Sequence, residues 1–217
     1  MPIEHRSHNA LPYLFSAAAN ADQPAPLVLF LHGGRGRGTE LNTLLKWGLP
    51  RFVNESDALP YFFAAPQIPE EQTWVDRASD AIALLDQLIA SHPIDPSRAI
   101  VAGFSLGSAG AWHLSTSHPD RFAGLVAVSG RVPKTLGESE LAVLKDIPIQ
   151  IFQGGKDENL PVEDTEQFVS TLRGLGATVD FIVLPEGDHF IADAVYSDPK
   201  LQQWLVSQSR HQTAVVA

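Results

Sequence analysis

The stretch that decides the fold reads Gly103-Phe104-Ser105-Leu106-Gly107. It follows directly on the apolar run Ala99–Gly103 and leads into an amphipathic stretch that continues through Trp112. A strand, a sharp turn and a helix in this order form a nucleophile elbow, which presents a serine hydroxyl beside backbone N–H donors. Glycines on both sides of the serine let the chain turn without side-chain clashes. The pentad therefore predicts that Ser105 is a nucleophile and that the N–H of Leu106 is one donor to an oxyanion.

The pentad by itself is a weak signal, because a chain with 16 glycines in 217 residues would contain about 0.09 such pentads by chance. The alternative is a tight strand-to-helix turn whose serine caps the helix and does no chemistry. The apolar run before the pentad and the helical spacing after it favour the nucleophile.

Outward from the pentad, short apolar runs alternate with longer amphipathic stretches, which is typical of a mostly parallel sheet flanked by helices. We expect strands at Leu11–Ser16, Leu27–His32, Tyr61–Ala65, Ala99–Gly103, Gly124–Ser129, Ile149–Gln153 and Thr178–Leu184. We expect helices over Asp76–Ser91, Leu106–Ser117 and Val162–Leu175. Residues 1–217 are expected to form one α/β domain with a weakly patterned tail from about residue 208. The connection Arg131–Ile147 is too short for a large cap domain, so we expect an open site.

A serine nucleophile on such a sheet needs a histidine base and an acid that follow it in the chain, in the order serine, acid, histidine. His189 lies in Glu186-Gly187-Asp188-His189-Phe190, directly after the strand expected to end at Leu184. The alternative for His189 is an ordinary surface histidine, and His211 is a weaker candidate in the tail. Four other histidines precede every acid candidate and so fail the order test: His32, His92, His113 and His118. His189 is therefore the predicted base.

The acid is expected at the end of the strand Ile149–Gln153, where Gly154-Gly155-Lys156-Asp157 supplies a carboxylate after a flexible turn. Asp157 would accept the His189 ring N–H, fix its tautomer and stabilise the imidazolium formed during proton transfer. Glu158 is the adjacent competitor, and Asp188 is better explained as a turn residue.

The second oxyanion donor is expected in the loop after the strand Leu27–His32, which reads His32-Gly33-Gly34-Arg35-Gly36-Arg37-Gly38. We assign the Gly34 N–H, with Arg35 as the alternative. The loop lacks the endings of the P-loop and dinucleotide motifs, so nucleotide binding is disfavoured. Arg35 and Arg37 either meet an acidic group of the substrate or are solvated loop arginines.

Four residues are expected to line the substrate pocket, because each lies near a loop at the carboxyl end of the sheet: Trp47, Trp74, Leu160 and Phe190. Packing in the core is the alternative for each of them.

The composition excludes several classes of function. The formal net charge of −10 gives no electrostatic footprint for nucleic acid or anionic lipid. The absence of cysteine excludes disulfides, a thiol nucleophile and a cysteine zinc site. No apolar run resembles a secretory signal or a membrane span, so we expect a cytoplasmic protein. No histidine pair has metallohydrolase spacing, and we expect neither a metal nor an organic cofactor. The oligomeric state is left open, a homodimer included.

The sequence resembles bacterial α/β-hydrolase esterases of the phospholipase/carboxylesterase and feruloyl-esterase-like type, often labelled predicted peptidases. The matching stretches are Leu11–Tyr13, Pro26–Gly33, Ile94–Arg98, Gly103–Gly107, His118–Phe122, Asp157 with Leu160–Val162, and Gly187–His189. The resemblance implies an α/β-hydrolase fold, a triad of Ser105, Asp157 and His189, and an oxyanion hole of Leu106 and Gly34.

We therefore expect a serine carboxylic-ester hydrolase that cleaves small to medium acyl esters through an acyl-enzyme, with water as the second substrate. A thioesterase or a peptidase with the same triad is the nearest alternative. A noncatalytic ligand-binding protein on this fold is an alternative of another class.

Overall fold

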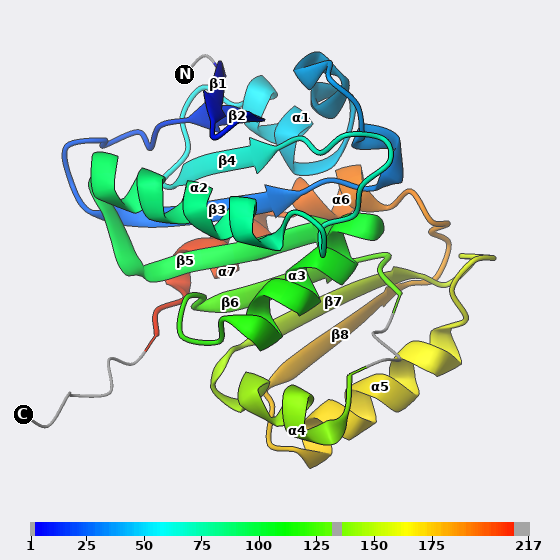
Figure 1. The fold of residues 1–217 in the computed structure, drawn as a ribbon. Helices are drawn as coiled ribbons and strands as arrows, with labels where there is room; N and C mark the ends of the chain where they lie inside the picture. Colours follow the sequence, from blue (N-terminus) through cyan, green and yellow to red (C-terminus); the bar gives the residue numbers. More distant parts are fainter. Residues whose placement is uncertain (1–2, 132–135, 211–217) are drawn as a thin grey trace, which may run out of the picture.

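A computed structural model describes residues 3–131 and 136–210 of the chain (Figure 1). His211 and most of the expected tail lie outside the described residues. One sheet of eight strands crosses the molecule in the order β1-β2-β4-β3-β5-β6-β7-β8. The strands are β1 Glu4–His8, β2 Leu11–Ser16, β3 Ala25–Leu31, β4 Phe62–Pro66, β5 Ile94–Phe104, β6 Gly124–Val128, β7 Ile149–Gly154 and β8 Val179–Leu184. Among the described strands, β1–β2 and β2–β4 pair antiparallel, and the other pairs are parallel.

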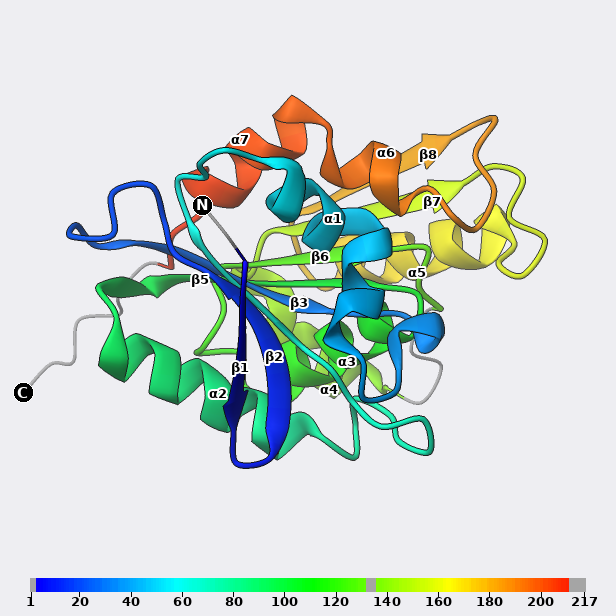
Figure 2. The ribbon, with the colours of Figure 1, turned by 90° about the horizontal axis from the view of Figure 1, so that it is seen from above.

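Helices cover both faces of the sheet. The α-helices are α1 Gly48–Glu55, α2 Ala78–Ser91, α3 Leu106–Ser117, α4 Glu138–Leu141, α5 Val162–Gly174, α6 Ala192–Tyr196 and α7 Pro199–Ser207. Short 3-10 helices are η1 Gly34–Gly36, η2 Leu41–Lys46 and η3 Ala142–Asp146. Figure 2 shows α1, α6 and α7 on one face of the sheet and α2 and α3 on the other. The fold is a single-domain α/β-hydrolase fold, as the sequence predicts.

The two faces of the sheet form two separate hydrophobic cores. Along β3, Leu27, Leu29 and Leu31 pack with α2 and α3, whereas Val28 and Phe30 pack with α1, α6 and α7. Successive side chains of a strand point to opposite faces, so a strand covered on both sides is apolar at every position. This is why the parallel strands read as continuous apolar runs.

The predicted strands and helices are present with shifts of a few residues at their ends. The edge strand β1 was not predicted, because its sequence Glu-His-Arg-Ser-His is polar throughout. The connection from β6 to β7 contains only α4 and η3 among its described residues, and residues 132–135 lie outside them. Within residues 3–131 and 136–210, no helix has the length and apolarity needed to cross a membrane.

The fold brings four loops together at one edge of the sheet. They follow the carboxyl ends of β3, β5, β7 and β8, which are parallel and adjacent except for β6 between β5 and β7. Gly34, Ser105, Asp157 and His189 lie on these loops, one on each. A functional site is therefore expected at the carboxyl edge of the sheet.

Candidate active site

Ser105 lies on the turn between β5 and α3 with φ 53° and ψ −113°. A residue other than glycine in this region costs on the order of 1–3 kcal/mol, so the surrounding structure must hold it there. The Ser105 N–H donates to the Val128 carbonyl at the end of β6 (2.9 Å). The neighbouring Ser108 is fully buried, and its hydroxyl accepts the Val128 N–H (3.1 Å). These contacts fix the elbow to the next strand.

The glycines of the pentad are required by close approach of α3 to the sheet. A Cβ on Gly107 would lie 1.8 Å from the Leu31 carbonyl oxygen at the end of β3. A Cβ on Gly103 would lie 2.3 Å from the backbone of Gly107. Both distances are far below van der Waals contact, so larger residues would push the first turn of α3, and Ser105 with it, away from the sheet.

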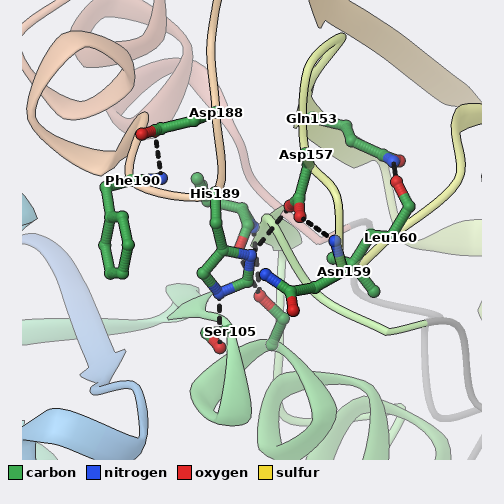
Figure 3. Close-up of polar contacts among 10 residues, drawn as sticks. Ser105, Gln153, Asp157, Asn159, Leu160, Asp188, His189 and Phe190 are labelled. Carbon is green, nitrogen blue, oxygen red and sulfur yellow. Dashed lines mark hydrogen bonds and ion pairs between the residues drawn. The ribbon is translucent and has the colours of Figure 1, made fainter.

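Ser105, His189 and Asp157 form one hydrogen-bonded chain (Figure 3). His189 Nε2 lies 3.0 Å from Ser105 Oγ, and His189 Nδ1 lies 2.8 Å from Asp157 Oδ2. The Asp157 side chain is completely buried, and its second oxygen accepts the backbone N–H of Asn159 (2.9 Å). Because a carboxylate only accepts hydrogen bonds, it places the ring proton on Nδ1 and leaves Nε2 free to accept the proton of Ser105.

Two other carboxylates, Glu158 and Asp188, were considered from the sequence as the acid. Glu158 is exposed, and among the described residues no hydrogen bond or ion pair joins it to His189. Asp188 accepts the backbone N–H of Phe190 (2.7 Å) and so stabilises the turn that carries His189 (Figure 3).

The loops that carry Asp157 and His189 are joined through their backbones. Lys156 N–H donates to the Gly187 carbonyl, and Gly155 N–H donates to the Leu184 carbonyl, both at 2.8 Å. A Cβ on Gly154 would lie 2.1 Å from the Asp188 carbonyl oxygen, so the glycine permits this close approach. The distance between Asp157 and His189 is therefore set by main-chain contacts and does not depend on the two side chains alone.

The loop after β3 is held by the buried ring of His32. Its Nδ1 donates to the Gly33 carbonyl (2.7 Å), because its Nε2 accepts the Ile68 N–H (3.2 Å). Burial lowers the pKa of His32 from 6.5 to about 4; the hydrogen bond to Gly33 opposes this shift, and the charge of Arg37 adds to it. His32 is therefore neutral at pH 7 and acts as a fixed support for the loop.

The loop residues Gly34 and Arg35 line the same cavity as Ser105. Neither Gly34 N–H nor Arg35 N–H has an acceptor in the part of the chain that the structure describes. Leu106 is the first residue of α3, so its N–H has no acceptor within the helix. Gln67 Nε2 donates to the Gly36 carbonyl (2.8 Å) and fixes the far side of the loop. Both donors considered from the sequence, Gly34 and Arg35, are thus available.

Two cavities open at Ser105 and His189. The first, here called the aromatic cavity, has a volume of about 550 Å³. Its apolar walls include Phe30, Leu44, Trp47, Phe104 and Phe190, and its polar lining includes Arg35, Arg37 and Asp193. The second cavity has a volume of about 510 Å³ and is lined by Leu106, Ala109, Ser129, Arg131, Asn159 and Leu160. Ser105 and His189 thus lie where two separate spaces meet.

Three of the four predicted pocket residues line these cavities, and Trp74 does not. Trp47 and Phe190 line the aromatic cavity, and Leu160 lines the second. Trp74 is only 1% exposed, and its indole N–H donates to the His32 carbonyl (2.9 Å). The prediction for Trp74 is wrong because its ring packs in the core beside α3. From there its indole N–H binds the His32 carbonyl, at the start of the loop after β3.

Several lining residues were missed in the sequence. Phe104 lies inside the pentad, and its ring is tilted by 48° beside that of His189, with ring centroids 5.5 Å apart. Ser129 and Arg131 follow the end of β6, and this position at the carboxyl edge was the available signal. No group of three or more histidine, aspartate or glutamate side chains within residues 3–131 and 136–210 is arranged to hold a metal ion.

Comparison with known proteins places the chain in a family. The model of the phospholipase/carboxylesterase family matches residues 62–198, which include Ser105, Asp157 and His189. The chain belongs to this family. The loop that carries Gly34 lies before the matched residues.

Individual relatives of this phospholipase/carboxylesterase-family chain are distant. It is 30% identical over 147 residues to the candidate esterase NocK of Nocardia uniformis subsp. tsuyamanensis, covering 64% of the chain and 42% of that protein. It is 26% identical over 165 residues to a candidate carboxymethylenebutenolidase of Methylorubrum extorquens, covering 62% of the chain and 55% of that protein. The crystal structure of a thermostable esterase superposes with a TM-score of 0.77 at 25% identity, covering 96% of the chain and 63% of that structure. The chain thus spans about half the length of the Nocardia uniformis and Methylorubrum extorquens proteins.

Proposed function

We propose that this family member is a serine carboxylesterase that cleaves esters through an acyl-enzyme formed on Ser105. The observation that carries the proposal is the continuous hydrogen-bonded chain from Ser105 Oγ through His189 to the buried carboxylate of Asp157, at 3.0 and 2.8 Å. A serine hydroxyl becomes an effective nucleophile only beside such an oriented base.

In the proposed first step, Ser105 Oγ attacks the ester carbonyl while His189 Nε2 takes its proton. Asp157 stabilises the imidazolium that forms, because the two groups are held together away from water. The carbonyl oxygen becomes an oxyanion, which accepts the N–H groups of Leu106 and Gly34. His189 then protonates the leaving alcohol, and the acyl group remains on Ser105.

In the second step, His189 removes a proton from a water molecule, which attacks the acyl-enzyme. The tetrahedral intermediate collapses, the acid leaves, and Ser105 recovers its proton from His189. The same two backbone donors stabilise both tetrahedral intermediates. The mostly apolar walls of the aromatic cavity favour small to medium acyl or aryl groups as one part of the ester.

The test is hydrolysis of matched 4-nitrophenyl esters, acyl thioesters and anilides by the purified protein and its Ser105→Ala variant. We expect turnover of the short and medium esters and a loss of nearly all of it in Ser105→Ala, because the substitution removes one side-chain oxygen and leaves the fold intact. Unchanged turnover in that variant would refute the mechanism. A clear preference for thioesters or anilides would reassign the reaction while keeping the nucleophile.

A further inference from the structure

Positively charged side chains gather around the aromatic cavity. Arg35 and Arg37 line it, and Lys46 Nζ lies 5.9 Å from the ring centroid of Trp47, another lining residue. The chain as a whole is acidic, with 25 aspartate and glutamate residues against 15 lysine and arginine residues. The cluster of cationic side chains beside the proposed nucleophile is therefore a local exception to the negative charge of the chain.

Among the described residues these three cations have no acidic partner, unlike four of the ten arginines of the chain. Arginines at four other positions each lie within 4.0 Å of a carboxylate: Arg6, Arg51, Arg77 and Arg121. Among residues 3–131 and 136–210, no carboxylate lies that close to Arg35, Arg37 or Lys46. Their charges are available to a ligand.

The carboxylate that does line the cavity is already occupied. Asp193 accepts the backbone N–H of Gly48 (2.5 Å) through one oxygen and binds Arg51 (3.0 Å) through the other. Arg51 also binds Glu55 (2.9 Å), so it balances the charge of Asp193 only in part, but among the described residues Asp193 forms no ion pair with Arg35 or Arg37. Two arginines, Arg35 and Arg37, against one aspartate, Asp193, give the lining a formal net charge of +1.

Both arginines are held at the cavity by contacts that leave hydrogen-bond donors unused. The guanidinium of Arg35 lies 4.4 Å above the ring of Phe190, the residue after the triad histidine. Arg37 uses its Nε to donate to the Gly34 carbonyl (3.2 Å). A guanidinium has five N–H donors, so most remain free to bind a carboxylate through two parallel hydrogen bonds.

We propose that the natural ester carries a carboxylate, bound by Arg35 and Arg37 in the aromatic cavity while the ester carbonyl lies at Ser105. The proposal rests on the esterase function above and names its substrate class. Solvated loop arginines, the alternative, would give no preference for a charged ester. An anion held by hydrogen bonds from charged donors gains between about 10-fold and 100-fold in specificity over a neutral group of the same shape.

The test compares esters that differ only in replacing a carboxylate by a carboxamide. One pair carries the difference on the acyl side: the 4-nitrophenyl half-esters of adipate and of adipamate. The other pair carries it on the alcohol side: 4-acetoxybenzoate and 4-acetoxybenzamide. We expect kcat/KM to favour the carboxylate by about 10-fold or more in one pair, which also shows which part of the ester enters the aromatic cavity. The preference falls below about 3-fold in the double variant Arg35→Gln/Arg37→Gln.

The matched control is Arg131→Gln, because Arg131 lies at the second cavity and also has no carboxylate within 4.0 Å in the described part of the chain. We expect it to keep the preference for the carboxylate. Loss of the preference in Arg131→Gln, with its retention in the double variant, would overturn the assignment to the aromatic cavity. A ratio near 1 in both pairs for the wild-type protein would overturn the proposal, while hydrolysis of the neutral esters would leave the esterase function intact.

A binding measurement separates the two proposals if no ester is turned over. Adipamate, adipamide, 4-hydroxybenzoate and 4-hydroxybenzamide are titrated into Ser105→Ala by calorimetry, with and without the two arginine substitutions. Absence of hydrolysis for all four esters refutes the esterase function. Tighter binding of a carboxylate than of its amide partner, lost with Arg35 and Arg37, supports the carboxylate site; equal binding overturns it.

Discussion

The buried imidazole of His32 makes the stability of the fold depend on pH. Burial lowers its pKa from 6.5 to about 4. As pH falls below 6.5 the unfolded chain takes up a proton that the folded chain does not accept until about pH 4, so the free energy of unfolding decreases through this window. The full shift corresponds to about 3 kcal/mol, of which about 2 kcal/mol is already lost between pH 7 and pH 5.

The assay is urea unfolding at pH 7 and pH 5 for the wild-type protein and His32→Asn, with His5→Gln as the control because His5 is exposed. Other groups also titrate in this range, so the quantity of interest is the difference in pH dependence between proteins. We expect the wild-type protein and His5→Gln to lose about 2 kcal/mol more than His32→Asn. Equal losses in all three proteins, or a wild-type His32 resonance titrating near pH 6.5 by NMR, would refute the reasoning.

Three further outcomes follow from the site. Asp157→Asn should fold but lower kcat by roughly 10⁴-fold, because the amide favours the wrong tautomer of His189. Glu158→Gln should lower kcat far less, and reversed effects would mean that the acid is Glu158. Gly107→Ala should lose more than about 3 kcal/mol of stability or fail to fold, since its Cβ would meet the Leu31 carbonyl at 1.8 Å; chemical denaturation tests this, and wild-type stability would contradict it. Rates on C2 to C16 esters should rise smoothly across the solubility limit, because no cap domain is present among the described residues; a sharp interfacial rise would indicate a lid.

Much of the fold and the three residues proposed as the triad could be predicted from the sequence. The parallel strands are covered on both faces, so they appear as continuous apolar runs such as the residues of β3. Each of Ser105, Asp157 and His189 comes directly after such a run or within a few residues of one. Parallel strands bring their carboxyl ends to one edge, which is why residues far apart in the chain could be assigned to one site.

The parts that could not be predicted depend on tertiary packing. β1 is polar and recognisable as a strand only through its pairing with β2. Trp74 lies close to the carboxyl edge of the sheet, but nothing in its local sequence shows that its ring turns inward to the His32 carbonyl. The absence of a carboxylate beside Arg35 is likewise a property of the folded chain, because acidic residues occur throughout the sequence.

The central claim, that Ser105 is an activated nucleophile, is tested most directly by covalent labelling with a fluorophosphonate followed by intact-mass analysis and peptide mapping. Such a probe reacts with a serine that a neighbouring base activates, and a binding pocket alone does not suffice. We expect one adduct per chain on the peptide that contains Ser105, with labelling greatly slowed in His189→Ala and absent in Ser105→Ala. No adduct on the folded wild-type protein, or an adduct that persists in Ser105→Ala, would contradict the claim.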